Sequence, residues 1–390
     1  MSNTTALIPP LDVQTVREDA DSPPIGVAGS QGDDDLRASR PSSPVVLRRA
    51  IADAQNFDQL REAACGLRTT AVALQEAHAG PAQSSAIISN LADSLTRRSI
   101  ELSVSALGPP PCPFSWVALG SHGRREPVPS SDVDSALAWE CDEEDGDVKS
   151  YMLSLGSRVC EALARCGLAA DKRGASAGGD LFVRPTSDWR RLIRESITDP
   201  EKDKGLIVIS LFLDGRVLRH GGGASGLRHE FEAATGRRGL VSLMLRLALA
   251  NKPAVGRLRD FVVERSGEQR GRLDIKHGGL LPVTSIARYA SLAAGATVAA
   301  STPERLSAAD AAGTLDSRSA RSLGKAFELF QSLRLEHQVD QIERGVEPDD
   351  HLDPKALQPE RRLLLRDALK DVRAIQNKLR RSLSSGRAFA

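Results

Sequence analysis

The chain has few aromatic residues, few cysteines and no excess of either charge. Aromatic residues make up 4% of the 390 residues, and 52 lysines and arginines face 51 acidic residues. The resulting net charge of +1 gives no strong signal for nucleic-acid binding. The five cysteines form no CxxC pair, which disfavours a disulfide framework or a zinc site and favours a reducing cytoplasm.

Long hydrophobic runs are also missing. The longest apolar stretch, YASLAAGATVAA at 289–300, is too short to span a bilayer. The first 24 residues show no basic region followed by an apolar one, so we expect no signal peptide. These absences predict a cytoplasmic protein without membrane association.

The pattern along the chain divides it into four segments. Residues 1–44 are rich in Pro, Ser, Gly and Asp, which predicts a disordered arm. Residues 45–108 carry apolar residues at helical spacing and predict an N-terminal helical segment of two helices, ended by GPPPCP. Residues 109–222 alternate short apolar segments with helical ones, which predicts a small α/β domain with a mixed sheet. Residues 223–390 are helical almost throughout and predict an all-α bundle.

Within the α/β segment, FSWVAL (114–119) predicts a buried strand and DVDSALAW (132–139) an alternating one. KSYMLSLGSRVCEALARCG (149–167) predicts a helix, and GGDLFV (178–183) a further strand. The run LIVISLFLDGRVL (206–218) is compatible with a strand or with a helix that leads into a strand.

The first of these strands ends in GSHGRRE. Gly120 allows a sharp turn, after which backbone N–H groups and the Ser121 hydroxyl point outwards as donors for phosphate oxygens. Arg124 and Arg125 follow, and at least one of them can add a bidentate contact. A Gly-Ser turn alone is a weak signal.

The second strand begins with two alternating aspartates. Asp132 and Asp134 lie two residues apart, so that both carboxylates leave one face and raise each other's pKa unless a cation neutralises them. Mg²⁺ prefers such oxygen ligands and completes its shell with triphosphate oxygens. Asp214 is placed to supply a third carboxylate from a neighbouring strand, with Arg216 on the same face. An isolated DxD is more often a strand start in a solvated loop, but the complete string from Gly120 to Asp134 favours a site.

This string resembles the signature of the nucleotidyltransferase fold in the DNA polymerase beta superfamily. More narrowly, it is similar to a bacterial nucleotidyltransferase family related to protein-PII uridylyltransferase and glutamine synthetase adenylyltransferase. That family carries G-S-x-G-R-x-E, S/T-D-x-D and then D-x-R before a glycine. The matching positions are Gly120, Ser121, Gly123, Arg124, Glu126, Ser131, Asp132, Asp134, Asp214, Arg216 and Gly221.

The resemblance covers roughly residues 45–385 and implies a catalytic domain followed by a helical one. In the family, CBS or cyclic-nucleotide modules often precede the catalytic part, whereas an arm stands there in this chain. A cysteine expected before the Gly-Gly of 178–179 is also missing, although Gly179 and Trp189 fit. These departures weaken what the resemblance implies about regulation more than what it implies about catalysis.

Further basic residues lie in the helical half. Lys276, in LDIKHGG, and Arg288 are candidates for a basic wall that closes over the nucleotide, as the resemblance implies. A plain surface turn between two helices is an equally good interpretation.

Together these features predict a nucleotidyltransferase that moves NMP from an NTP to an acceptor hydroxyl with one or two Mg²⁺ ions. Gly120 and Ser121 would hold the phosphates, Arg124 would neutralise them, and Asp214 would bind a second ion and accept the acceptor's proton. The resemblance favours a tyrosine on a regulatory protein as acceptor, with small molecules and RNA left open. A nucleotide-binding sensor or signalling scaffold of the same fold is the alternative. The sequence specifies neither the base of the nucleotide, nor the acceptor, nor whether the chain forms a homo-oligomer.

Overall fold

The structure of the protein is a computed structural model that describes most of the chain outside its first 42 residues. The described residues are 43–141, 146–169, 175–199, 205–221, 238–256, 261–295 and 301–384. The predicted disordered arm therefore lies almost entirely outside them. Residues 40–390 belong to one compact unit.

The N-terminal helical segment contains four helices where the periodicity predicted two. They are α2 (Pro44–Asp53), α3 (Phe57–Ala64), α4 (Gly66–Glu76) and α5 (Pro81–Leu107). The first predicted helix is interrupted because the Asn56 side chain accepts a hydrogen bond from the Gln59 N–H and caps the start of α3. α5 ends at Leu107, and Gly108, whose φ is 88°, caps it.

A four-stranded mixed sheet forms the centre of the α/β segment. Its strands are β1 (Phe114–Ala118), β2 (Ser135–Trp139), β3 (Val183–Pro185) and β4 (Arg216–Arg219), in the order β3-β2-β1-β4. β1 is antiparallel to both β2 and β4, while β2 and β3 are parallel. Because Ala118 pairs with both Ser135 and Arg216, the end of β1 lies beside the starts of β2 and β4. The short helix α6 (Gly120–Gly123) follows at this edge.

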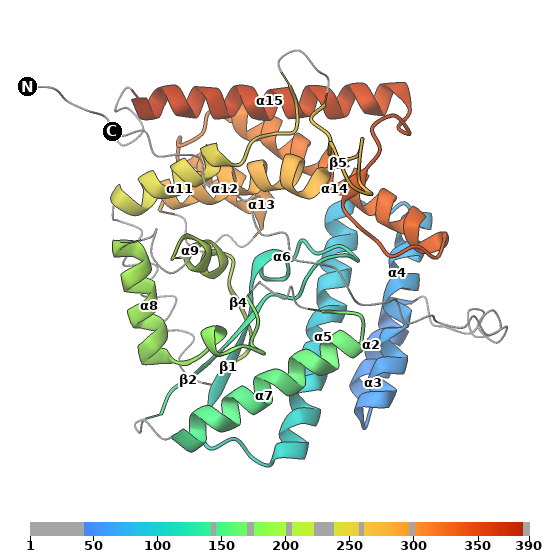
Figure 1. Cartoon of the computed structure of the whole chain (residues 1–390), viewed down its shortest axis with the longest axis vertical. Helices are drawn as coiled ribbons and strands as arrows, with labels where there is room; N and C mark the ends of the chain where they lie inside the picture. The colour runs from blue at the N-terminus through green and yellow to red at the C-terminus, as the bar shows by residue number, and fades with distance from the viewer. Residues whose placement is uncertain are drawn as a thin grey trace, which may run out of the picture. The chain divides into compact units, whose positions relative to one another are not determined.

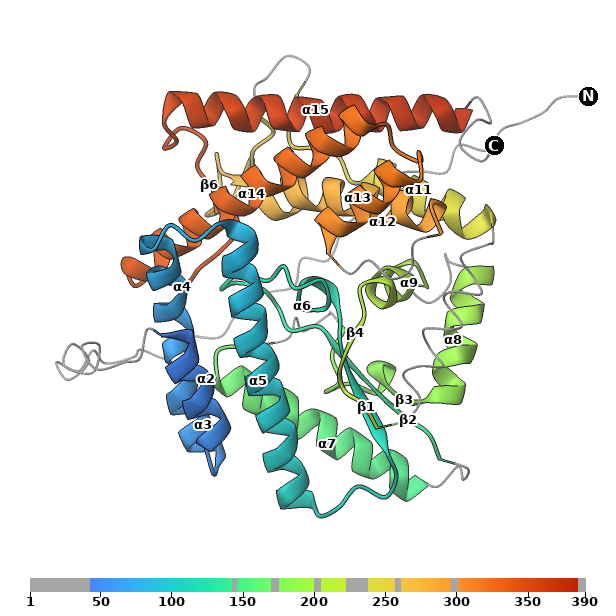
Figure 2. The same cartoon turned by 180° about the vertical axis from the view of Figure 1, so that it is seen from behind.

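Helices cover both faces of the sheet (Figures 1 and 2). Side chains alternate along the strands, so Trp116 and Leu137 pack with α5 and α7, whereas Val117 and Ala136 join the core of the other face. The helices of this segment are α7 (Gly146–Arg165), the 3₁₀ turn η1 (Asp180–Phe182), α8 (Thr186–Thr198) and α9 (Gly205–Leu213). The core that contains α8 and α9 continues without a break into the C-terminal helices.

The ambiguous run 206–218 forms a helix followed by a strand, namely α9 and then β4. Its apolar residues lie on all sides and therefore carry no period that separates helix from strand. Asp214 lies between the two elements, and β4 neighbours β1 rather than β2. The expectation that Asp214 ends a strand beside the one carrying the aspartate pair is therefore wrong.

The C-terminal segment is mainly helical, as predicted. Its helices are α11 (Arg238–Ala250), the π-helical turn η3 (Lys276–Leu280), α12 (Leu281–Ala293), α13 (Thr302–Ala311), α14 (Ser317–Glu343) and α15 (Pro359–Ser384). A two-stranded antiparallel sheet of β5 (Leu273–Asp274) and β6 (His351–Leu352) departs from the all-α prediction. No helix in the described part of the chain combines the length and the apolar character needed to cross a membrane.

A buried ion pair fastens the α6 edge of the sheet to α5. Arg216 donates to both carboxylate oxygens of Asp93, at 2.7 and 2.9 Å, and to the His122 carbonyl at 2.8 Å. The two side chains are 15% and 5% exposed. Arg216 was expected to face Asp214; it binds Asp93 and the backbone of α6 instead.

Asp93→Ala should lower the free energy of unfolding by about 3–5 kcal/mol, because it leaves the buried Arg216 guanidinium without its carboxylate. Urea unfolding at pH 7 measures this loss. The control is Asp53→Ala, which removes a pair with Arg49 whose side chains are 72% and 85% exposed; it should cost less than about 1 kcal/mol. Equal losses in both variants would contradict the role given to Arg216.

Candidate active site

The turn after β1 lies against one of the two aspartates. Gly120 has φ of 55°, in the left-handed region, and a Cβ there would lie 2.2 Å from Oδ2 of Asp134. Any other residue here would have to adopt a backbone conformation that favours glycine and would displace the Asp134 carboxylate. The structure therefore brings the Gly-Ser turn and the aspartate pair together, with Gly120 directly beside the Asp134 carboxylate.

The aspartates directly precede β2. Asp132 is partly exposed, and its Oδ2 lies 3.6 Å from Nζ of Lys276, at the start of η3. The pKa of Asp134 is raised to about 6, first by burial and then by the neighbouring Asp132 carboxylate, while Lys276 and Arg124 oppose both effects. The pair is a site where a second negative charge is costly and a cation is favoured.

Asp214 has different surroundings. Its carboxylate is fully buried and receives hydrogen bonds from three arginines. Arg288 donates from Nε at 3.1 Å to each oxygen and from Nη2 at 2.5 Å; Arg305 donates at 2.5 Å, and Arg124 pairs with Oδ2. Burial alone would raise the pKa of Asp214, but the charges of Arg124, Arg288 and Arg305 outweigh it and hold the pKa well below its ordinary value.

This arrangement differs from the expected cluster of three carboxylates. Among the described residues, no group of three or more His, Cys, Asp or Glu side chains is placed to hold a metal ion. Asp132 and Asp134 lie together, whereas Asp214 is occupied by arginines. A carboxylate whose pKa is held this low is also a poor proton acceptor. The structure therefore does not place Asp214 as a metal ligand or a general base.

A cavity of about 90 Å³ separates α6 from the C-terminal helices. Three of the predicted site residues line it, namely Ser121, Arg124 and Lys276. The remaining lining residues are Glu126, Ser131, Leu280, Leu281, Thr284, Phe327, Gln331 and Arg334. Pockets for whole drug-sized ligands measure roughly 300–1,000 Å³, so this cavity is the size of a phosphate group rather than of a nucleotide.

Two other predicted residues lie elsewhere. Arg125 is exposed, has φ of 61° and forms no ion pair within the described residues. Arg288 binds Asp214 from α12 and does not line the cavity. Of the predicted basic wall, Lys276 faces the carboxylate pair, and Arg288 belongs to the buried arginine cluster.

The sequence did not indicate two residues, Glu126 and Arg305, that connect the segment after β1 with α13 and with Asp214. Glu126 accepts hydrogen bonds from Arg124 Nε at 2.7 Å, from the Thr302 N–H at 2.5 Å and from Thr302 Oγ1 at 3.1 Å. Arg305, one turn further along α13, binds Asp214. Glu126 belongs to the motif that follows β1. Arg305 lies 91 residues from its partner Asp214, so no local sequence pattern predicts their contact.

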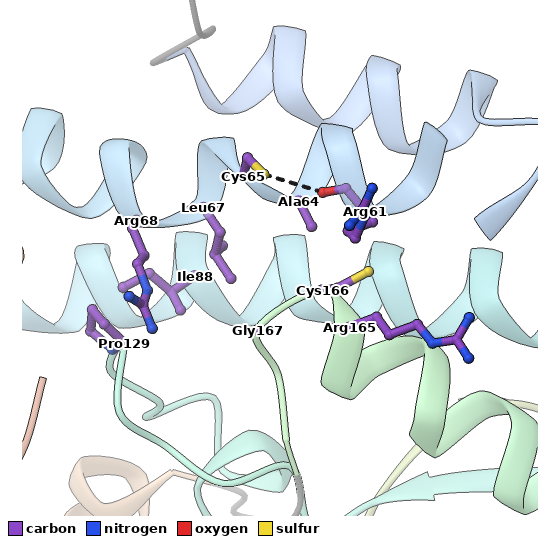
Figure 3. A pocket seen from close by; sticks show the side chains of 10 residues that line it. All are labelled: Arg61, Ala64, Cys65, Leu67, Arg68, Ile88, Pro129, Arg165, Cys166 and Gly167. Carbon is purple, nitrogen blue, oxygen red and sulfur yellow. Dashed lines mark hydrogen bonds between the residues drawn. The ribbon is translucent and has the colours of Figure 1, made fainter. Parts of the chain in front are cut away.

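Another cavity, of about 280 Å³, is lined by none of the predicted site residues. Figure 3 shows its lining, to which α3, α4 and α7 each contribute an arginine: Arg61, Arg68 and Arg165. Cys65 and Cys166 also line it, but no carboxylate does. Without carboxylates it cannot hold the divalent cation that the aspartate pair calls for, and we do not assign the active site to it.

Two family models match the chain. One, described as "Putative nucleotidyltransferase DUF294", matches residues 66–203, which include the α6 turn and the aspartate pair. The other, described as "Putative nucleotidyltransferase substrate binding domain", matches residues 238–383, which include Lys276, Arg288 and Arg305. No curated protein matches the chain.

Asp134→Asn should stabilise the folded protein at pH 8 by about 1–3 kcal/mol in the absence of divalent cations. The folded-state pKa of about 6 lies above the ordinary 3.8, so ionisation of Asp134 opposes folding. This penalty is complete above pH 6 and disappears below about 4. Urea unfolding at pH 8 and pH 4 measures both limits, and a gain that persists unchanged at pH 4 would contradict the assignment.

Asp214→Asn should have the opposite effect, with a loss of about 3–5 kcal/mol at pH 7, because three buried guanidinium groups lose the carboxylate charge that they share. The depressed pKa of Asp214 means that its ionised form stabilises the fold above pH 3.8 and loses this effect as pH falls through the folded-state value. Thermal unfolding at pH 7 tests the expectation. A variant as stable as the wild type would show that the cluster does not hold the fold.

Proposed function

We propose that the chain transfers NMP from an NTP to an acceptor hydroxyl and releases pyrophosphate, a proposal that the two matching nucleotidyltransferase family models support. The observation that carries the proposal is the contact between the Gly120 turn and the Asp134 carboxylate, with Asp132 beside it. A phosphate-binding turn and a cation-binding pair at one edge of a sheet are the parts that nucleotidyl transfer needs.

We infer that Mg²⁺ is the cation. The donors are carboxylate oxygens, which suit this ion, and burial together with the Asp132 carboxylate raises the pKa of Asp134, so a bound cation would stabilise its ionised form. The ammonium of Lys276, 3.6 Å from Asp132, already supplies a positive charge there. When bound, the ion would neutralise the triphosphate and the charge that develops on its oxygens. Because Asp214 is held by arginines, we propose one ion bound by Asp132 and Asp134.

The chain's own residues would position the triphosphate. The Ser121 hydroxyl and the backbone N–H groups of the turn would donate to phosphate oxygens, and Arg124 and Lys276 would bring positive charge from the two sides of the cavity. Arg124 is held by Glu126 and Asp214, so its guanidinium is oriented before a nucleotide arrives. Asp214, Arg288 and Arg305 are proposed to act through Arg124 as positioning residues.

The acceptor is proposed to be a hydroxyl on a protein, with a regulatory tyrosine as the favoured case. A cavity of about 90 Å³ would leave the sugar and base of the nucleotide outside it. The helical domain, matched by the model of a substrate-binding domain, would present that partner.

A nucleotide-binding sensor remains the second candidate. The observation that favours it is the lack of a third carboxylate beside the aspartate pair among the described residues. Such a protein would bind a Mg²⁺–triphosphate complex and turn it over little. Pyrophosphate release distinguishes the two candidates, because only the transferase produces it when an acceptor-containing lysate is added.

The double variant Asp132→Asn/Asp134→Asn should fold and should lose Mg²⁺-dependent triphosphate binding by at least tenfold, since a neutral pair cannot hold the cation. Calorimetric titration of each protein with NTP, with and without Mg²⁺, measures this loss. The control is Asp367→Asn/Asp371→Asn, which removes two exposed charges from α15 and should bind as the wild type does. Unchanged affinity in the first variant would refute both the transferase and the sensor.

A further inference from the structure

Two cysteines lie opposite each other where β1 and β2 meet at the end of the sheet remote from α6. The antiparallel register pairs Phe114 with Trp139. Cys112 lies in a bend two residues before β1, and Cys141 lies two residues after β2, so the two cysteines flank this terminal pair.

The two thiols also influence each other, since a side-chain hydrogen bond with Cys141 helps to raise the pKa of Cys112. Both cysteines are free. Cys112 is 7% exposed and packs in the core that covers one face of the sheet, while Cys141 is exposed. The pair therefore combines a sheltered thiol with an accessible one.

We propose that Cys112 and Cys141 form a dithiol that a peroxide oxidises to an intrachain disulfide. A peroxide first oxidises the exposed Cys141 thiolate to a sulfenic acid and is itself reduced, releasing one water when the oxidant is hydrogen peroxide. The Cys112 sulfur then displaces the sulfenic oxygen as a second water, and the S–S bond forms. Two thiols and one hydrogen peroxide thus give one disulfide and two waters, and a thiol reductant reverses the change.

The order of the two steps follows from the surroundings of the thiols. The pKa of Cys112 is raised to about 12, first by burial and then by its interaction with Cys141. A buried thiol with a raised pKa is a poor nucleophile towards a peroxide in solution, whereas Cys141 is reachable. Cys112 therefore acts as the resolving thiol, because its partner is already beside it.

The bond would close a loop that contains the complete candidate phosphate and cation motif. Gly120, Ser121, Asp132 and Asp134 all lie between the two cysteines in the sequence. β1 leads into the phosphate-binding turn, and β2 follows the aspartate pair. A disulfide between these two segments restricts the unfolded chain. The melting temperature of the oxidised protein should therefore exceed that of the reduced protein by roughly 4 °C or more.

Mass spectrometry tests the proposal on the full chain. The protein is treated with hydrogen peroxide, free thiols are alkylated, and trypsin is added without reductant. We expect residues 99–124 joined to residues 126–149, with two hydrogens lost, and expect the link to disappear after reduction. The same link should form in the variant Cys65→Ser/Cys160→Ser/Cys166→Ser, which keeps only the proposed pair.

Single variants separate the two roles. Cys112→Ala should leave a sulfenic acid on Cys141 that dimedone traps, and Cys141→Ser should leave Cys112 unoxidised. Because Cys112 is buried, each variant is first compared with the wild type by circular dichroism, and the triple variant remains decisive if Cys112→Ala does not fold. Irreversible oxidation of Cys141 without a link to Cys112, or a link only between Cys65 and Cys166, would overturn the proposal.

Discussion

The ion cluster centred on Asp214 is the interaction on which the candidate site depends. One buried carboxylate binds Arg124 from the loop after β1, Arg288 from α12 and Arg305 from α13. These arginines come from the α/β segment and from the C-terminal helices, so the cluster joins the two parts beside the cavity. A Cβ on Gly123 would lie 2.1 Å from the Asp214 carbonyl, so the glycine of the loop is what allows this approach.

Two carboxylates at this edge have opposite electrostatic roles. Asp214 is stabilised as an anion by three cations, whereas Asp134 is destabilised as an anion by burial and by Asp132. The first arrangement strengthens the fold, and the second costs stability unless a cation binds. The unfavourable ionisation of Asp134 is typical of a cation-binding site, whereas the stabilised anion of Asp214 is typical of a structural ion cluster.

Local features of the site could be predicted from the sequence, and long-range partners could not. Strands β1 and β2, the Gly120 turn and the aspartate pair follow from apolar patterning and short spacings. The helix α9 could not be separated from a strand because its residues are apolar on every side. The partners of Asp214 and Arg216 lie 74 to 123 residues away along the chain, so only tertiary packing decides them. For this reason the sequence predicted Arg216 beside Asp214, whereas in the structure Arg216 binds Asp93.

Crystals grown with Mn²⁺ in place of Mg²⁺ and a non-hydrolysable NTP would test the central claim most directly. Anomalous scattering locates the manganese independently of the protein model. The account predicts one manganese bound by Asp132 and Asp134 and by the triphosphate, with Asp214 still paired to Arg124, Arg288 and Arg305. A manganese coordinated by all three aspartates, with the arginines displaced, would contradict it, as would a nucleotide bound away from the Gly120 turn.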